Sequence, residues 1–178
     1  QEVRPKKNSW EEQEMVLLRK YRMEDVDSIA RHAGNEKVAR WMRDSFPPPY
    51  TRQDAETFIA SCIAREGQGQ LVRTIEVDGA AVGSIGVFVG GDVYCKSGEL
   101  GYWLGEAYWG RGIMTQAVRQ LCEEAFRRFQ LLRIDAEPFA GNAASRSVLE
   151  KAGFTLEGIM RRSVYKNGQV QDSCMYAL

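Results

Sequence analysis

Residues 108–118 read YWGRGIMTQAV, with two glycines flanking an arginine immediately before a helical pattern. A helix N-terminus leaves its first backbone N–H groups without partners and carries about half a unit of positive charge. Gly110 and Gly112 allow a large anion to approach that backbone, because glycine has no Cβ. The stretch therefore predicts a phosphate cradle, with a tight strand-to-helix turn as the alternative.

Two common nucleotide motifs do not fit this stretch. A Walker loop needs a lysine and a hydroxyl residue after its last glycine, whereas Gly112 is followed by Ile113. A dinucleotide fingerprint needs a third glycine and an acidic residue about 20 positions later, and no such glycine follows. These differences disfavour a nucleotide-binding domain.

The apolar periodicity on both sides of the glycines predicts one α/β domain with a mixed sheet, over residues 15–178. The polar residues 1–14 are expected to form a loose tail. Asp78-Gly79 and Asn167-Gly168 are typical hairpin turns. Strands are expected at 15–19, 71–77, 80–89, 99–104 and 132–137 and on both sides of Asn167-Gly168, and helices at 25–33, 37–42, 51–65, after Gly112 and from Asn142 to Gly153.

The composition excludes several classes of protein. Lys plus Arg is 24 and Asp plus Glu is 24, so there is no overall attraction to nucleic acid or to an anionic membrane. No apolar run approaches the length of a membrane span, and no signal peptide is visible. The cysteines at 62, 95, 122 and 174 match no metal-ligand spacing. We therefore expect a cytoplasmic protein without a metal, whose cysteines are buried or half-buried.

A second stretch, residues 137–154, reads EPFAGNAASRSVLEKAGF. Together with residues 99–117, ELGYWLGEAYWGRGIMTQA, it closely resembles the GCN5-related N-acetyltransferase (GNAT) family, above all the branch that acetylates ribosomal proteins at N-terminal alanine or serine. The resemblance covers residues 15–178. It implies a twisted mixed sheet with helices on both faces, whose two central parallel strands splay apart to admit acetyl-coenzyme A as cosubstrate.

The resemblance also implies which residues bind the coenzyme. The family's pyrophosphate motif, Arg/Gln-x-x-Gly-x-Gly/Ala, extends here from Trp109 to Met114, with its required glycine at Gly112. Met114 stands at a position where the family usually has a small residue. The backbone of Trp103 and Leu104 is expected to pair with the pantetheine arm as an added strand would. Asn142 is expected against the same arm, and a helix cap is an equally good role for it. The cradle itself is assigned to Trp109, Gly110, Arg111, Gly112, Ile113, Met114 and Thr115.

For catalysis, the resemblance implies a general base at Glu99, with Glu137 as second choice. Leu149 occupies the position where many relatives carry a tyrosine that protonates the leaving thiol. The ribosomal-protein branch has a serine three residues after the asparagine, here Ser145, although a serine in a first helical turn often bonds the backbone instead. His32, the single histidine, has no nucleophile at a recognisable spacing. We therefore expect direct transfer in a ternary complex.

The acceptor is expected to be a primary amine, either a protein N-terminus or a small molecule. Trp41, Tyr50 and Tyr165 are the candidate walls of its site, although aromatic residues also serve in cores. The fold does not identify the acceptor. A non-catalytic acyl-CoA-binding sensor or interaction module is the alternative function. The late strands are a candidate surface for a homodimer, and no residue pattern decides the oligomeric state.

Overall fold

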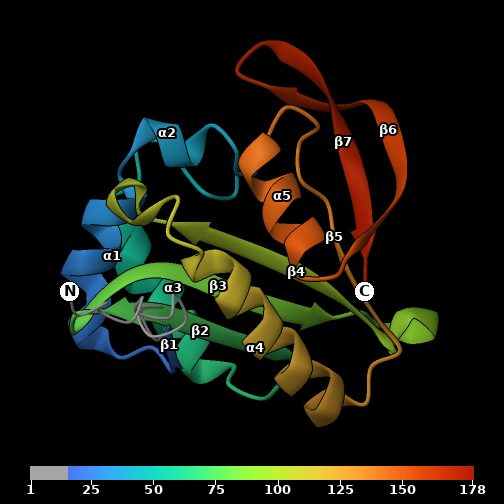
Figure 1. The fold of residues 1–178 in the computed structure, drawn as a ribbon. Coiled ribbons are helices and arrows are strands. Elements are labelled where there is room, and N and C mark those ends of the chain that lie inside the picture. Colours follow the sequence, from blue (N-terminus) through green and yellow to red (C-terminus); the bar gives the residue numbers. More distant parts are fainter. Residues whose placement is uncertain (1–15) are drawn as a thin grey trace, which may run out of the picture.

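A computed structural model describes residues 16–178, and the predicted tail at 1–14 lies outside the described residues. The strands form one mixed sheet in the order β1-β2-β3-β4-β5-β7-β6 (Figure 1). Every neighbouring pair is antiparallel except β4 and β5, which run parallel. The strands are β1 (Leu17–Arg19), β2 (Gln70–Val77), β3 (Ala80–Val89), β4 (Ser97–Leu104), β5 (Arg133–Ala136), β6 (Thr155–Lys166) and β7 (Gln169–Ala177).

Helices cover both faces of this sheet, as predicted. One hydrophobic cluster joins α4 and α5 to one face, and a second cluster joins α1 and α3 to the other. Figure 1 shows α4 crossing the sheet, with α1 and α3 behind it. The helices are α1 (Val26–Ala33), α2 (Glu36–Ala39), α3 (Arg52–Ala64), α4 (Ile113–Phe129) and α5 (Ala143–Lys151).

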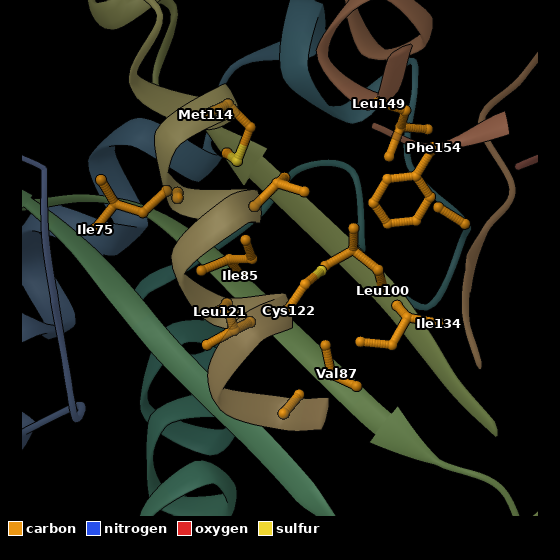
Figure 2. Packing of buried hydrophobic residues seen from close by; sticks show 14 of the residues in the cluster. Ile75, Ile85, Val87, Leu100, Met114, Leu121, Cys122, Ile134, Leu149 and Phe154 are labelled. Atoms are coloured by element: carbon orange, nitrogen blue, oxygen red, sulfur yellow. The ribbon is translucent and has the colours of Figure 1, made fainter. Parts of the chain in front are cut away.

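Helix α4 is held on the sheet by a continuous apolar stripe. Ile113, Ala117, Leu121 and Ala125 recur every four residues and are at most 1% exposed. Figure 2 shows Leu121 and Cys122 in the space between α4 and the sheet residues Ile85 and Val87. This packing fixes the N-terminal end of α4 against the middle of the sheet.

The two central parallel strands separate after a short contact. β4 and β5 pair only at Ser97↔Arg133, Gly98↔Ile134 and Glu99↔Asp135. Beyond this point β4 continues beside β3 to Leu104, whereas β5 ends at Ala136 before Pro138. The edge of β4 from Leu100 to Leu104 therefore faces an opening instead of a strand, which confirms the predicted splay.

The turns and most element boundaries agree with the sequence predictions. Asp78-Gly79 and Asn167-Gly168 have positive φ at both positions (50° and 80°, 50° and 73°), as the tight hairpin turn requires. The helix predicted at 37–42 is shorter, because Asn35 caps a single turn and the chain then leaves the helix. Cys95 was expected to be at least half-buried and is exposed instead.

Leu121→Ala is expected to lower the free energy of unfolding by about 2–5 kcal/mol, because it opens a cavity beneath α4. Chemical denaturation monitored by circular dichroism measures this change. The control is Glu123→Ala on the exposed side of the same helix, expected to stay within about 0.5 kcal/mol of the unmodified chain. Equal effects of the two variants would contradict the packing described for α4.

Candidate active site

A cavity of about 1050 Å³ occupies the opening between β4 and β5. The start of α4 and the free edge of β4 form one part of its wall. Helix α5 adds Asn142 and Ser145, and the chain between α2 and α3 adds an aromatic wall. The cavity therefore joins the glycine stretch to the residues predicted to handle the acceptor.

The glycine stretch is built to receive an anion. Gly110 and Gly112 have φ of 73° and 75°, and a Cβ on either residue would meet no atom within 4 Å. The first backbone bond of α4 runs from the Gln116 N–H to the Gly112 carbonyl, and no side chain caps this end. The N–H groups of residues 113–115 thus point out of the helix end, where residues 109–115 line the cavity. These features fit a diphosphate.

Two side chains of this stretch, Met114 and Arg111, are held by contacts with other residues. Met114, at a position where a small residue is usual, is 7% exposed and packs in the core beneath α4 (Figure 2). Its side chain therefore leaves the backbone cradle open. Arg111 folds back, donating from Nη2 to the Ala107 carbonyl (3.1 Å) with its guanidinium 5.3 Å from the centre of the Tyr108 ring.

The strand register corrects the prediction for Trp103. The Gly105 N–H donates to Val82 (2.8 Å) and the Gly90 N–H to Ser97 (2.9 Å) across β3 and β4. Since hydrogen-bonded pairs alternate in an antiparallel ladder, the backbone of Trp103 is directed to β3. The groups at the open edge belong to Tyr102 and Leu104 instead. The Leu104 carbonyl already accepts a bond from Trp109 Nε1 (2.8 Å).

Helix α5 brings the Ser145 hydroxyl to the Tyr102 hydroxyl of β4. Asn142 caps the helix by accepting from the Ser145 N–H (3.2 Å), so its helix-cap role is present. Ser145 Oγ lies 2.7 Å from the hydroxyl of Tyr102. Burial raises the pKa of Tyr102 to about 12, so this hydroxyl keeps its proton at neutral pH. Leu149 is fully buried in the core (Figure 2).

Sequence reasoning missed Tyr102. Side chains alternate along β4, so Tyr102 is expected on the face of the sheet opposite Glu99 and Trp103, away from the predicted base. The missing information was that α5 would lie on that face and present Ser145 to it, 43 residues away along the chain.

The predicted base lies on the other face of the sheet. Glu99 has a half-exposed side chain, and Oε1 is 2.9 Å from Nη2 of Arg43. The same guanidinium is 4.0 Å from Glu137 Oε2, so one arginine bridges both predicted carboxylates. Ser173 donates to Glu137 Oε1 (2.9 Å). Arg43 was not predicted, because an arginine in a polar loop carries no signal of its long-range partner.

The loop that carries Arg43 is anchored a second time. Asp44 Oδ1 lies 2.9 Å from Nζ of Lys166, a lysine of β6 that is 4% exposed. The chain between α2 and α3 is thus tied to β4 through Glu99 and to β6 through Lys166. It is also tied to Glu137, which directly follows β5. These ion pairs link the loop to the sheet beside the cavity.

The predicted acceptor residues separate into two groups. Trp41 and Tyr50 line the cavity, where Phe46 stacks near Tyr50 (4.7 Å between ring centres) and meets Trp103 edge-on (5.9 Å). Tyr165 is 74% exposed in β6 and is not among the lining residues. The structure therefore does not bring Tyr165 to the acceptor side, because its side chain projects from the outer strand of the sheet.

Three other groups contribute nothing to the cavity. His32 packs edge-on against Tyr108 (5.6 Å between ring centres), and burial lowers its pKa. Burial also raises the pKa of the Cys62 and Cys122 thiols to about 12.

Within residues 16–178, no three or more His, Cys, Asp or Glu side chains are grouped to hold a metal ion. No helix in that range is long and apolar enough to cross a membrane.

A family model described as an acetyltransferase (GNAT) domain matches residues 15–155, most of the chain. The chain belongs to the GNAT family. Its fold agrees with that of a GNAT enzyme solved with coenzyme A, a ribosomal L7/L12 alpha-N-protein acetyltransferase termed RimL. That structure has a TM-score of 0.81 and 25% sequence identity, over 92% of this chain and 93% of the other.

Two curated relatives match a shorter stretch of this GNAT chain. The probable N-acetyltransferase YjcK of Bacillus subtilis (strain 168) is 46% identical over 79 residues, 44% of each chain. The ribosomal-protein-serine acetyltransferase of Escherichia coli (strain K12) is 33% identical over 82 residues, 46% of each chain. The matched region thus covers less than half the length of each of these relatives.

Gly112→Asp is expected to weaken coenzyme A binding by at least about tenfold, because it places a negative charge at the helix end that attracts anions. Isothermal titration calorimetry measures the affinity. Gly79→Asp is the matched control, since Gly79 also has positive φ (80°) and open space around its Cβ position, but lies in a hairpin outside the cavity. The cradle assignment fails if both variants bind coenzyme A equally well.

Proposed function

We propose that this GNAT domain is an N-acetyltransferase that uses acetyl-CoA to acetylate the α-amine of a protein N-terminus by direct transfer. One observation carries the proposal: a single cavity connects an uncapped, glycine-bordered helix end to a pair of carboxylates across an open strand edge. The E. coli relative is named for ribosomal-protein serine, and the RimL structure for an alpha-N-protein acetyltransferase. These names support a protein N-terminus as the acceptor, with serine as one candidate first residue.

The residues divide naturally into a coenzyme side and an acceptor side. The backbone N–H groups of residues 111–115 would hold the diphosphate, and the open edge at Tyr102 and Leu104 would bond the pantetheine arm. Asn142 would contact the same arm with the groups that its capping bond leaves free. When bound, acetyl-CoA supplies an acetyl group activated as a thioester. The residues of the chain then position the amine, deprotonate it and stabilise the departing thiolate.

Glu99 is the proposed general base. Its carboxylate accepts the proton of the acceptor ammonium, directly or through one water, which is worth about 10²–10⁴-fold in rate. Arg43 occupies this carboxylate at 2.9 Å, so the arriving ammonium must share Glu99 with Arg43 or displace it. Glu137 is the second choice, because Ser173 and Arg43 already bind its oxygens.

The hydroxyl pair of Tyr102 and Ser145 is proposed to serve the leaving group. The two oxygens are 2.7 Å apart and come from the strand and the helix that border the coenzyme side of the cavity. With its raised pKa, Tyr102 donates a hydrogen bond and relays it through Ser145 Oγ toward the departing sulfur. This arrangement replaces the tyrosine that many relatives carry at the position of Leu149.

Direct transfer is preferred to a covalent enzyme intermediate. No cysteine contributes to the wall of the cavity over the part of the chain that the structure describes. The buried thiols at Cys62 and Cys122 have pKa values of about 12 and stay protonated. A cytoplasmic location and a homodimer remain predictions.

The ion pair between Arg43 and Glu99 favours one alternative, a non-catalytic acyl-CoA sensor, because Arg43 already occupies the carboxylate that an acceptor ammonium would have to reach. An acceptor screen at fixed acetyl-CoA separates the two functions. The panel contains peptides that begin with Ser or Ala, spermidine and an aminoglycoside, and the readout is release of free thiol. Release with the peptides supports the proposal, whereas tight coenzyme binding without thiol release from any acceptor supports the sensor.

Glu99→Gln is expected to lower the rate of acetylation by about 10²–10⁴-fold, because the amide cannot accept the proton. Coenzyme affinity should stay within about twofold, since Glu99 lies on the face of the sheet opposite Tyr102 and Ser145. Glu137→Gln is the matched variant, with the smaller effect expected. An unchanged rate in Glu99→Gln would remove this residue from the mechanism.

Tyr102→Phe and Ser145→Ala are expected to lower kcat by about 2- to 10-fold each, the usual worth of a neutral hydrogen bond. The double variant should be little worse than either single variant, because the two hydroxyls act as one relay. Steady-state kinetics on all four proteins gives the coupling. Fully additive losses would show that the hydroxyls act independently.

A further inference from the structure

Two glycines form part of the cavity wall beside Glu99. Gly101 of β4 lies directly opposite Gly86 of β3 in the strand register, and both residues line the cavity. Side chains alternate between the faces of a strand, so Gly101 shares the face of Glu99 and Trp103. Two residues along a strand correspond to about 7 Å. The glycine pair therefore lies within one residue's reach of the proposed base.

The two glycines have different surroundings. A Cβ on Gly86 would approach the Phe88 ring to 3.0 Å and Val72 to 3.2 Å, so neighbouring side chains already close over it. A Cβ on Gly101 would meet no atom within 4 Å. The space above Gly101 is thus an open hollow of the cavity, with Gly86 beside it on the floor.

The fold does not require a glycine at position 101. Gly83 and Gly98 are demanded by packing, because a Cβ would come within 2.7 Å of the Trp103 carbonyl oxygen and of Val87 respectively. Gly101 has no such neighbour and does not have positive φ. Glycine weakens a strand interior, where β-branched residues are preferred. Because this open glycine also lines the cavity, its position indicates that the space is used by a ligand.

Apart from Glu99 and its partner Arg43, the strand residues around this hollow are uncharged. Phe88 stands opposite Glu99 in the register, and Ser84 stands opposite Trp103. Val72 of β2 lies next to Gly86, and beyond it the cavity continues to Phe58 and Ser61 of α3. The hollow is therefore mainly apolar, with hydroxyl groups further along, and suits an uncharged side chain.

We propose that the hollow above Gly101 receives the side chain of the amine-bearing residue of the acceptor, and that Gly101 sets the size limit for that side chain. The inference rests on the proposed function, because it places the reacting amine at Glu99. A peptide whose amine lies at this carboxylate can extend its first side chain over Gly101, about 7 Å along β4. The acceptor class is then a chain whose first residue is uncharged.

Gly101→Val tests this inference with a series of peptides that differ only in the first residue, Gly, Ala, Ser or Leu. The expected result is a graded loss of kcat/KM that grows with the size of the first residue. The kcat/KM for the Leu-initiated peptide, divided by that for the Gly-initiated peptide, should fall by about tenfold or more in Gly101→Val. In Gly101→Ala this ratio should lie between the values for Gly101→Val and the unmodified chain. Coenzyme A affinity and the unfolding midpoint report on the fold and should not fall.

Gly158→Val is the matched control. Gly158 is also a strand glycine without positive φ and with no atom within 4 Å of its Cβ position, but it lies in β6 outside the cavity. It should leave the size ratio unchanged. A Gly101→Val protein that folds and shows an unaltered ratio overturns the size limit.

Peptide binding measured by calorimetry in the presence of coenzyme A distinguishes the two proposals. Size-dependent weakening by Gly101→Val without turnover in any protein supports the hollow and overturns the proposed catalysis. Turnover in the unmodified chain with equal losses for all peptides overturns the hollow alone. An unmodified chain that neither binds nor acetylates the peptides overturns both.

Discussion

The unpaired edge of β4 is the constraint on which the whole site depends. A strand in the middle of a sheet normally bonds on both sides, because free backbone N–H and C=O groups buried in protein are costly. Here the parallel contact with β5 ends at Glu99↔Asp135, and β5 bonds to β7 instead. The backbone groups of Tyr102 and Leu104 on this edge therefore have no strand partner. The opening exists because one strand is short and its neighbour is long.

Packing of α4 places the second requirement beside the first. The helix lies on the sheet through a stripe from Ile113 to Ala125, so its N-terminal end cannot move away from the strand that precedes it. Positive φ at Gly110 and Gly112 lets the chain enter the helix without side chains in the way. Helix dipole, free N–H groups and open strand edge thus meet in one cavity.

The two faces of β4 divide the chemistry. Alternation sends Tyr102 toward α5 and Glu99 toward the loop between α2 and α3, so a hydroxyl pair and a carboxylate pair stand on opposite sides of one strand. Arg43 and Asp44 tie that loop to the sheet by ion pairs, and its aromatic residues line the cavity. The same alternation places Gly101 beside Glu99, where the absence of a side chain leaves space.

What the sequence by itself determined is local. The glycine cradle, the stripe of α4, the Asn142 cap and the two hairpin turns depend on neighbours within a few residues, which periodicity and turn chemistry reveal. Only the tertiary structure decided that Tyr102 meets Ser145, that Arg43 bridges Glu99 and Glu137, that Trp103 turns its backbone to β3, and that Tyr165 stays outside the cavity. Each depends on strand register or on a loop crossing the sheet, and residues 19 to 94 positions apart leave no local pattern.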